Sequence, residues 1–135
     1  MIYLAADHRG FELKEKIKTA LETENLELEN GGAFEYDKDD DYVDFAKTAS
    51  EKVAENPSGN KAVLVCGSGH GMDMAANKFE GVRAALVFNA KVAIQSREHE
   101  DANVLVLASD WLEEKEAIEI VKTWLNTPFS GEERH

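Results

Sequence analysis

A cysteine followed by glycines at every second position lies near the middle of the chain. The residue types in this segment and their spacing could support chemistry. Cys66 ends a short apolar run, residues 62–65, and Gly67, Gly69 and Gly71 follow at every second position. Glycine lets a ligand approach the backbone closely, so several N–H groups can converge on one anion. A thiol beside such donors is expected to have a lowered pKa and to act as a base or nucleophile. The alternative is a buried cysteine next to a packing turn.

Three familiar phosphate-binding loops do not fit this stretch. The glycine spacing is not the GxGxxG of dinucleotide-binding proteins, and no Gly-Lys-Ser/Thr sequence follows, as a P-loop requires. The arginine of a cysteine-based phosphatase loop is replaced by Met72. The loop is therefore expected to hold an anion mainly through its backbone.

Three polar residues follow the first predicted strand, residues 2–6. Asp7, His8 and Arg9 offer an acid, a base and a cation where the chain leaves this strand for a helix. Because the carboxyl ends of parallel strands meet at one edge of a sheet, the triplet is expected beside Cys66. A solvated turn is the alternative, but the combination of the three residue types favours a functional interpretation.

Two more side chains are candidates for the site. Tyr42 lies in an acidic stretch, residues 35–44, most of whose charges are expected to be solvated, and the spacing of its carboxylates does not fit an EF-hand. His99 ends a predicted helix. A surface histidine at the negative end of a helix is the alternative to a catalytic one.

Composition favours a compact single domain over residues 1–135. The chain is 43% hydrophobic, and its 15 basic and 27 acidic residues give a net charge of −12, which disfavours nucleic acid and anionic lipid as partners. The first strand begins at residue 2, and no apolar run approaches the ~20 residues of a membrane span. A cytoplasmic protein without a signal peptide or membrane partner is expected. A single cysteine forms no internal disulfide, and no cysteine and histidine cluster indicates a metal.

Strands and helices are predicted to alternate along the chain. Apolar runs predict strands at residues 2–6, 26–28, 62–65, 81–87 and 102–107, with a turn at 30–32, and helical spacing predicts helices near 13–21, 43–56, 72–78, 90–99 and 112–126. This alternation favours an α/β fold with a parallel sheet of about five strands and helices on both faces. The ligand cleft is expected at the carboxyl ends of the strands.

Several segments occur in the order and spacing found in one known family. They are Ala6 to Phe11, Asp41 with Tyr42, Cys66 to Gly71, Ala75 to Lys78, Gly81 to Ala84, Ser96 to His99, Asn103 to Leu105, Pro128 with Phe129, Gly131, and Arg134 with His135. On these segments the chain resembles the family of ribose-5-phosphate isomerase B and galactose-6-phosphate isomerase. The resemblance implies a three-layer, Rossmann-like sandwich.

The resemblance also implies a sugar-phosphate aldose–ketose isomerase that interconverts ribose 5-phosphate and ribulose 5-phosphate without a metal or other cofactor. Such enzymes are homodimers or dimers of dimers with the site between subunits. In this pattern Cys66 matches the base that moves a proton between C1 and C2 through a cis-enediolate. The backbone of Gly67, Ser68, Gly69 and Gly71 matches the anion hole, and Ser68 keeps the hydroxyl of the usual threonine.

Four other residues receive roles from the same resemblance. His99 matches the residue that opens the furanose ring, and Asp7 lies nearby to hold sugar hydroxyls. His8 and Arg134 match phosphate contacts, and Arg134 reaches the site from the partner subunit. Histidine suits ring opening because it gives and takes a proton near neutral pH.

The chain departs from the family pattern at several positions. Glu100 stands where members commonly have an asparagine that holds the reacting oxygens, and Asp110 stands where many have arginine. His70 and Asp73 replace an aliphatic residue and a serine in the glycine loop. Most members also continue past the Arg-His pair with a basic tail. Arg9 is expected to compensate by binding the phosphate.

Two alternatives follow from these departures. One is an isomerase of another phosphosugar, such as allose 6-phosphate or galactose 6-phosphate, and the other is a non-catalytic sugar-phosphate binding protein. Galactose-6-phosphate isomerases divide their site between two different subunits, whereas Cys66 and His99 occur in one chain here, which favours the ribose enzyme. Binding alone would need neither a base nor a ring-opening acid, which argues against the binding protein.

Overall fold

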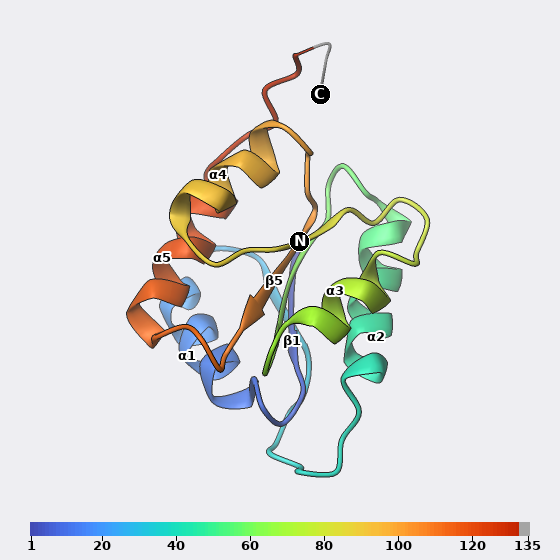
Figure 1. Cartoon of the computed structure of the whole chain (residues 1–135), viewed down its shortest axis with the longest axis vertical. Coiled ribbons are helices and arrows are strands. Elements are labelled where there is room, and N and C mark those ends of the chain that lie inside the picture. Colours follow the sequence, from blue (N-terminus) through green and yellow to red (C-terminus); the bar gives the residue numbers. More distant parts are fainter. Residues whose placement is uncertain (133–135) are drawn as a thin grey trace.

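Strands and helices alternate throughout the computed structural model, in which residues 1–132 are described (Figure 1). The strands are β1 (Ile2–Ala6), β2 (Leu28–Gly32), β3 (Lys61–Cys66), β4 (Ala84–Leu86) and β5 (Val104–Ala108). The helices are α1 (Phe11–Glu22), α2 (Tyr42–Glu55), α3 (His70–Ala76), α4 (Ala90–Glu98) and α5 (Glu114–Leu125).

All neighbouring strands pair in parallel, and their order in the sheet is β2-β1-β3-β5-β4. The predicted α/β class with a five-stranded parallel sheet is thereby confirmed. The chain places β2 on one side of β1 and then returns to place β3 on the other side. Doubly wound sheets bind ligands outside the carboxyl ends of the strands at such a switch point. Here that point lies between β1 and β3.

The two edge strands differ from the sequence prediction. The turn expected at residues 30–32 is wrong, because these residues continue β2: Asn30 pairs with Leu4, and Gly32 pairs with Ala5 after a register shift. At the other edge, β4 is confined to residues 84–86. An edge strand is held by backbone hydrogen bonds on one side only and packs fewer side chains, so its apolar pattern is weak.

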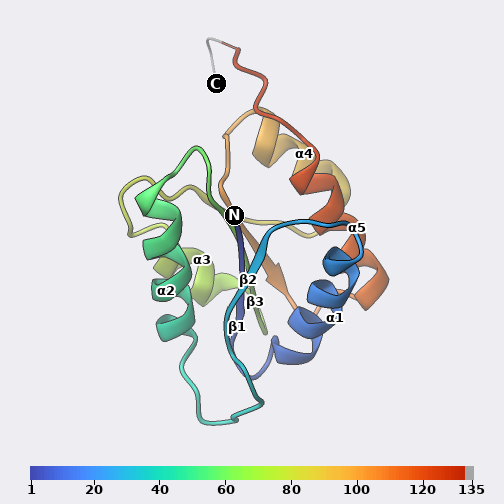
Figure 2. The same cartoon turned by 180° about the vertical axis from the view of Figure 1, so that it is seen from behind.

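Helices cover both faces of the sheet, with α1, α4 and α5 on one side and α2 and α3 on the other (Figure 2). Side chains alternate between the two faces along each strand. In β3, Val63 and Val65 pack on the side of α1 and α5, whereas Leu64 and Cys66 pack on the side of α2 and α3. Because both faces are buried, β3 is apolar almost throughout.

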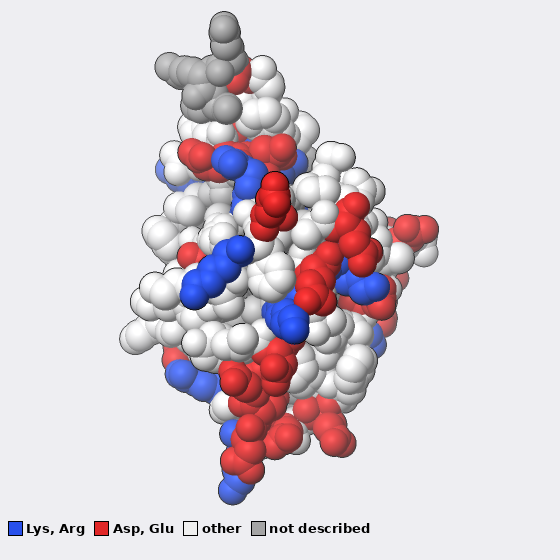
Figure 3. Space-filling view, turned by 90° about the vertical axis from the view of Figure 1, so that its right-hand side faces the viewer, with Lys and Arg blue, Asp and Glu red and all other residues white. Residues whose placement is uncertain are grey.

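Acidic side chains are numerous on the face that carries α2 and α3 (Figure 3). Figure 3 shows carboxylates gathering over the lower part of this face, where the connection from β2 to α2 runs. Asp37 and Asp39 in this connection are exposed. Among the described helices, none has both the length and the apolar character needed to cross a bilayer.

Candidate functional site

Asp7 lies directly after β1, at the switch point of the sheet. Only 5% of its surface is exposed, and its Oδ1 accepts a hydrogen bond of 3.0 Å from the backbone N–H of Gly10. Burial raises the pKa of the Asp7 carboxyl above its ordinary value; the nearby Asp40 charge adds to this, whereas the Gly10 N–H and His8 oppose it. The protein therefore holds a carboxyl group with increased proton affinity at the mouth of the crevice.

Cys66 ends the neighbouring strand β3, and 5% of its surface is exposed. Burial raises the pKa of its thiol, and this outweighs the N–H groups of Met72 and Gly69, which favour the thiolate. The lowered pKa expected from the sequence is therefore wrong. The reason is desolvation: the thiol packs among the apolar side chains between the sheet and helices α2 and α3.

The glycine loop is approached by two of the predicted side chains. A Cβ atom on Gly67 would lie 2.1 Å from the guanidinium carbon of Arg9, and a Cβ atom on Gly71 would lie 2.6 Å from the ring of Tyr42. Gly69 has φ +81°, in the region that favours glycine. Glycine thus lets Arg9 and Tyr42 lie directly on the loop, and Ser68 lies in the same turn, where its Oγ accepts from the His70 N–H at 3.4 Å.

The turn after β5 holds Arg9 against this loop through contacts with its side chain and its backbone. Asp110 forms an ion pair with the Arg9 guanidinium, and its backbone N–H donates to the Gly67 carbonyl at 3.0 Å. The Ser109 hydroxyl contacts two carbonyl oxygens, that of Arg9 at 2.9 Å and that of Cys66 at 3.2 Å. The residue that departs from the family pattern, Asp110, therefore orients the cation expected to bind phosphate.

His8 is held by a residue that sequence reasoning missed. Asp40 Oδ1 accepts a hydrogen bond of 2.9 Å from the His8 backbone N–H and lies 2.8 Å from His8 Nδ1. The Asp40 side chain is only 10% exposed. The acidic stretch was expected to be a solvated face, and nothing in its composition distinguishes Asp40 from Asp39 or Asp41. Only the long-range contact identifies it.

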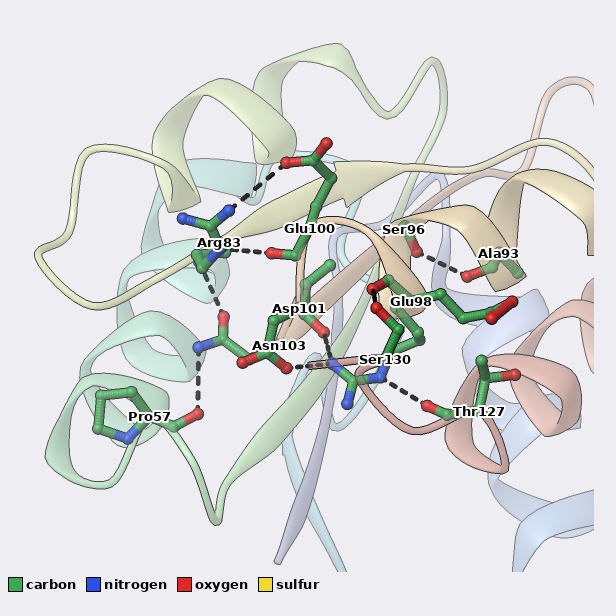
Figure 4. Close-up of polar contacts among 12 residues, drawn as sticks. Pro57, Arg83, Ala93, Ser96, Glu98, Glu100, Asp101, Asn103, Thr127 and Ser130 are labelled. Carbon is green, nitrogen blue, oxygen red and sulfur yellow. Dashed lines mark hydrogen bonds and ion pairs between the residues drawn. The ribbon is translucent and has the colours of Figure 1, made fainter. Parts of the chain in front are cut away.

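His99 and Glu100 lie at the opposite end of the sheet from Cys66, where the strands begin; this end is called the amino edge below. Helix α4 runs back from the carboxyl end of β4, so its last turn and His99 lie beside the amino ends of the strands (Figure 1). The backbone N–H of His99 donates to Gln95 at 2.9 Å. The Glu100 carboxylate lies 3.5 Å from Arg83 Nη2, and Arg83 Nε donates to the Glu100 carbonyl at 2.5 Å (Figure 4). One chain therefore does not bring His99 to Cys66.

The carboxyl-terminal segment docks on the same end of α4. The Ser130 hydroxyl and backbone N–H both donate to the Glu98 carbonyl, at 2.8 and 3.2 Å (Figure 4). The buried Arg97 donates from Nε to the Thr127 carbonyl at 2.9 Å and from Nη1 to Asp101 Oδ1 at 2.9 Å. These contacts lead the chain past His99, but Arg134 lies outside the described residues.

No group of three or more His, Cys, Asp or Glu side chains that could hold a metal ion occurs among residues 1–132. The described groups at the carboxyl edge are instead a buried acid, a buried thiol, a glycine loop and a paired cation. A doubly wound sheet with these groups at its switch point defines an α/β protein suited to proton transfer on a small anionic ligand.

Comparisons with known proteins identify the family. A family model described as Ribose/Galactose Isomerase matches residues 2–135. A probable ribose-5-phosphate isomerase B from Mycoplasma genitalium is 42% identical over 130 residues, which are 96% of this chain and 86% of that protein. The ribose-5-phosphate isomerase B of Mycobacterium tuberculosis is 37% identical over 134 residues, covering 99% of this chain and 82% of that protein.

A solved structure agrees with this assignment. The crystal structure of the Mycoplasma genitalium ribose-5-phosphate isomerase B with bound ribulose-5-phosphate has a TM-score of 0.96 and 41% identity, covering 98% of this chain and 88% of that one. The chain belongs to the ribose/galactose isomerase family. The class expected from the sequence, a sugar-phosphate isomerase, is confirmed.

Proposed function

We propose that this protein interconverts ribose 5-phosphate and ribulose 5-phosphate. The observation that carries the proposal is the position of Asp7 and Cys66 at the carboxyl ends of the neighbouring strands β1 and β3. Beside them lies a loop whose Gly69 and Met72 N–H groups face the thiol. Relatives named for this substrate cover nearly the whole chain, and one was solved with ribulose-5-phosphate.

The reaction moves one proton between C1 and C2 of the sugar and a second proton between O2 and O1. Cys66 is the proposed base: it removes the proton from C2 of the aldose, which gives a cis-enediolate, and it returns the proton to C1. The proton of the O2 hydroxyl passes to O1 within the enediolate, so that a ketose forms. Because burial raises the pKa of its thiol, the thiolate is a strong base once formed, and the Gly69 and Met72 N–H groups favour that charged form. Backbone N–H groups fixed at the enediolate oxygens stabilise charge that the aldose lacks; each is typically worth roughly 3 kcal/mol.

The other groups of the carboxyl edge bind the substrate in this proposal. Asp7 accepts hydrogen bonds from hydroxyl groups of the open-chain sugar. The ring of Tyr42 packs against Gly71 and bounds the site on that side of the loop. His8 and Arg9 hold the phosphate. The Arg83 side chain pairs with Glu100 and so offsets part of the negative charge of this carboxylate.

Ring opening is assigned to His99, and this assignment requires a second copy of the chain. His99 lies at the amino edge of the sheet and Cys66 at the carboxyl edge, so a chain cannot use both at one site. We therefore infer a homodimer, or a dimer of dimers, in which each subunit supplies His99 and Arg134 to the site of the other.

Mixing two inactive variants tests this arrangement. Cys66→Ser and His99→Ala should each be nearly inactive alone. After subunit exchange the mixture should recover roughly a quarter of wild-type activity, because about half of the dimers are mixed and each mixed dimer has one intact site. A mixture that stays as inactive as its components would reject the shared site.

The identity of the sugar is tested separately. The kcat/KM of the wild-type protein for ribose 5-phosphate should exceed that for allose 6-phosphate and galactose 6-phosphate. A higher kcat/KM for either hexose phosphate would identify a different phosphosugar isomerase, and binding of all three sugars without turnover would identify a binding protein.

A further inference from the structure

Asp40 is a buried carboxylate in a connection whose other acidic residues are exposed. Its side chain is 10% exposed, whereas the neighbouring Asp39 and Asp41 are exposed residues. Burying a carboxylate is costly unless hydrogen bonds compensate. The compensating hydrogen bonds to the Asp40 side chain come from one residue, His8, which lies 32 positions earlier in the chain.

The two contacts of Asp40 fix both the backbone and the ring of His8. Its Oδ1 accepts from the His8 backbone N–H at 2.9 Å and lies 2.8 Å from Nδ1. A carboxylate oxygen only accepts hydrogen bonds, so Nδ1 must carry the hydrogen in this contact. The ring of Tyr36 meets the imidazole edge-on, with 6.2 Å between ring centroids and an interplanar angle of 82°. The imidazole is therefore held on two sides, and Nε2 is left for another partner.

The second oxygen of Asp40 makes no compensating hydrogen bond within the described residues. Asp40 Oδ2 is buried and has no hydrogen-bond partner among residues 1–132. Buried polar atoms in folded proteins are nearly always satisfied, so an exception calls for an explanation. Among the described residues, the carboxylate therefore forms side-chain hydrogen bonds through Oδ1 alone, and both of them are to His8.

A pocket beside this pair offers space for an anionic group. It has a volume of about 340 Å³ and is lined by His8, Arg9, Phe11, Glu12 and Tyr36. Two of these residues are a cation and a histidine, and the imidazole position is determined by Asp40 from behind. An anion in this pocket would therefore meet a ring whose orientation is already set, which lowers the entropic cost of binding.

We propose that Asp40 is a positioning residue that holds His8 with Nδ1 protonated and Nε2 directed at the phosphate of the bound sugar. The identity of the bound sugar phosphate is taken from the proposed function. The connection between β2 and α2 thereby has a role, since its Asp40 and Tyr36 side chains both contact His8.

The first experiment compares Asp40→Asn with Asp39→Asn, which removes the same charge from the same connection. Asp40→Asn should raise the KM for ribose 5-phosphate and the inhibition constant of inorganic phosphate about tenfold, because the amide oxygen still accepts from Nδ1–H but lacks the charge that strengthens this hydrogen bond, with kcat nearly unchanged. Asp39→Asn should leave both constants near wild type or lower them slightly, because it removes a negative charge from the approach of an anion. Equal constants in the two variants would overturn the proposal.

A second experiment asks whether Asp40 acts through His8. In a His8→Ala background, Asp40→Asn should add little to the increase in KM. A full additional increase would show that Asp40 acts elsewhere and would overturn the proposal.

A third measurement separates this inference from the proposed function. Imidazole ¹⁵N NMR of the free wild-type protein should show His8 with its hydrogen on Nδ1, and Asp40→Ala should change that signal, whether or not ribose 5-phosphate is the substrate. A His8 signal that does not respond to Asp40→Ala would overturn the positioning role. Failure of the wild-type protein to turn over ribose 5-phosphate would instead reject the proposed function.

Discussion

The carboxyl and amino edges of the sheet carry different halves of the expected chemistry. At the carboxyl edge, Asp7 and Cys66 are each 5% exposed, and three connections from distant parts of the chain meet around them. At the amino edge, His99 and Glu100 are exposed residues at the end of a helix. The difference teaches that the residues expected to act together lie at opposite ends of the strands, which is why the proposed function uses a second copy of the chain.

Removing the thiol should cause the largest loss. Cys66→Ala should lower kcat for ribose 5-phosphate by about 10³-fold, within the range that a general base contributes. Cys66→Ser, which keeps the shape but is a far weaker base, should be similarly impaired. Because burial raises the pKa of the thiol, wild-type kcat/KM should rise as the pH increases from neutral, as more thiolate forms. Discontinuous or coupled assays of ketose formation measure both effects. Normal turnover by Cys66→Ala would show that Cys66 is not the base.

Removing the imidazole should cause a smaller loss that depends on the substrate. His99→Ala should lower kcat/KM for ribose 5-phosphate by about 10²-fold, since one general acid–base group is lost. The same variant should keep most of its activity toward erythrose 4-phosphate, whose O4 carries the phosphate and so cannot close a furanose ring. Gln95→Ala, one turn earlier on α4, is the control. Equal losses with both sugars would show that His99 acts in proton transfer or in binding rather than in ring opening.

Removing the cation at the carboxyl edge should affect binding. Arg9→Ala should raise the KM for the phosphorylated sugar about tenfold with a modest change in kcat, because a charge-assisted contact to the phosphate is lost. Lys16→Ala removes an equal charge from an exposed position of α1 and should have little effect. An unchanged KM in Arg9→Ala would reject its compensating role and would leave phosphate binding to His8 and the amino edge of the partner.

The sequence predicted the carboxyl edge well where local pattern and chemistry coincide. Strands β1 and β3 are buried on both faces, so their apolar runs are visible, and a polar residue directly after such a run must lie at the strand's carboxyl end. Asp7 and Cys66 were found in this way. Strand β2 was misplaced, because an edge strand with Asn30 and two glycines is held by backbone pairing rather than by side-chain burial.

What the sequence could not supply are contacts between distant positions. Asp40 reaches His8 over 32 positions and Asp110 reaches Arg9 over 101, and no local pattern marks either pair. The pKa direction of Cys66 was mispredicted for a related reason. The loop after it suggests donors and a lowered pKa, but helices α2 and α3 bury the thiol, and desolvation is the larger effect.

The smallest expected effect concerns stability, and it sharpens the contrast between the edges. Because burial raises the Asp7 pKa, the folded state binds this proton more tightly than the unfolded state does. The stability that the protonated carboxyl provides is complete at pH values below its unfolded pKa and is lost as the pH rises through the folded pKa. At pH values above its folded pKa, the ionised Asp7 therefore lowers the free energy of unfolding.

Asp7→Asn should consequently be more stable than wild type at pH 7, since an amide keeps the acceptor for the Gly10 N–H without the buried charge. The gain should shrink as the pH falls through the acidic range, and the variant should turn over poorly. Glu100→Gln, at the exposed amino edge, should show no comparable gain, because its carboxylate is solvated. Urea unfolding of both variants at several pH values measures this. A stability gain for Glu100→Gln equal to that for Asp7→Asn would mean that burial does not distinguish the two edges.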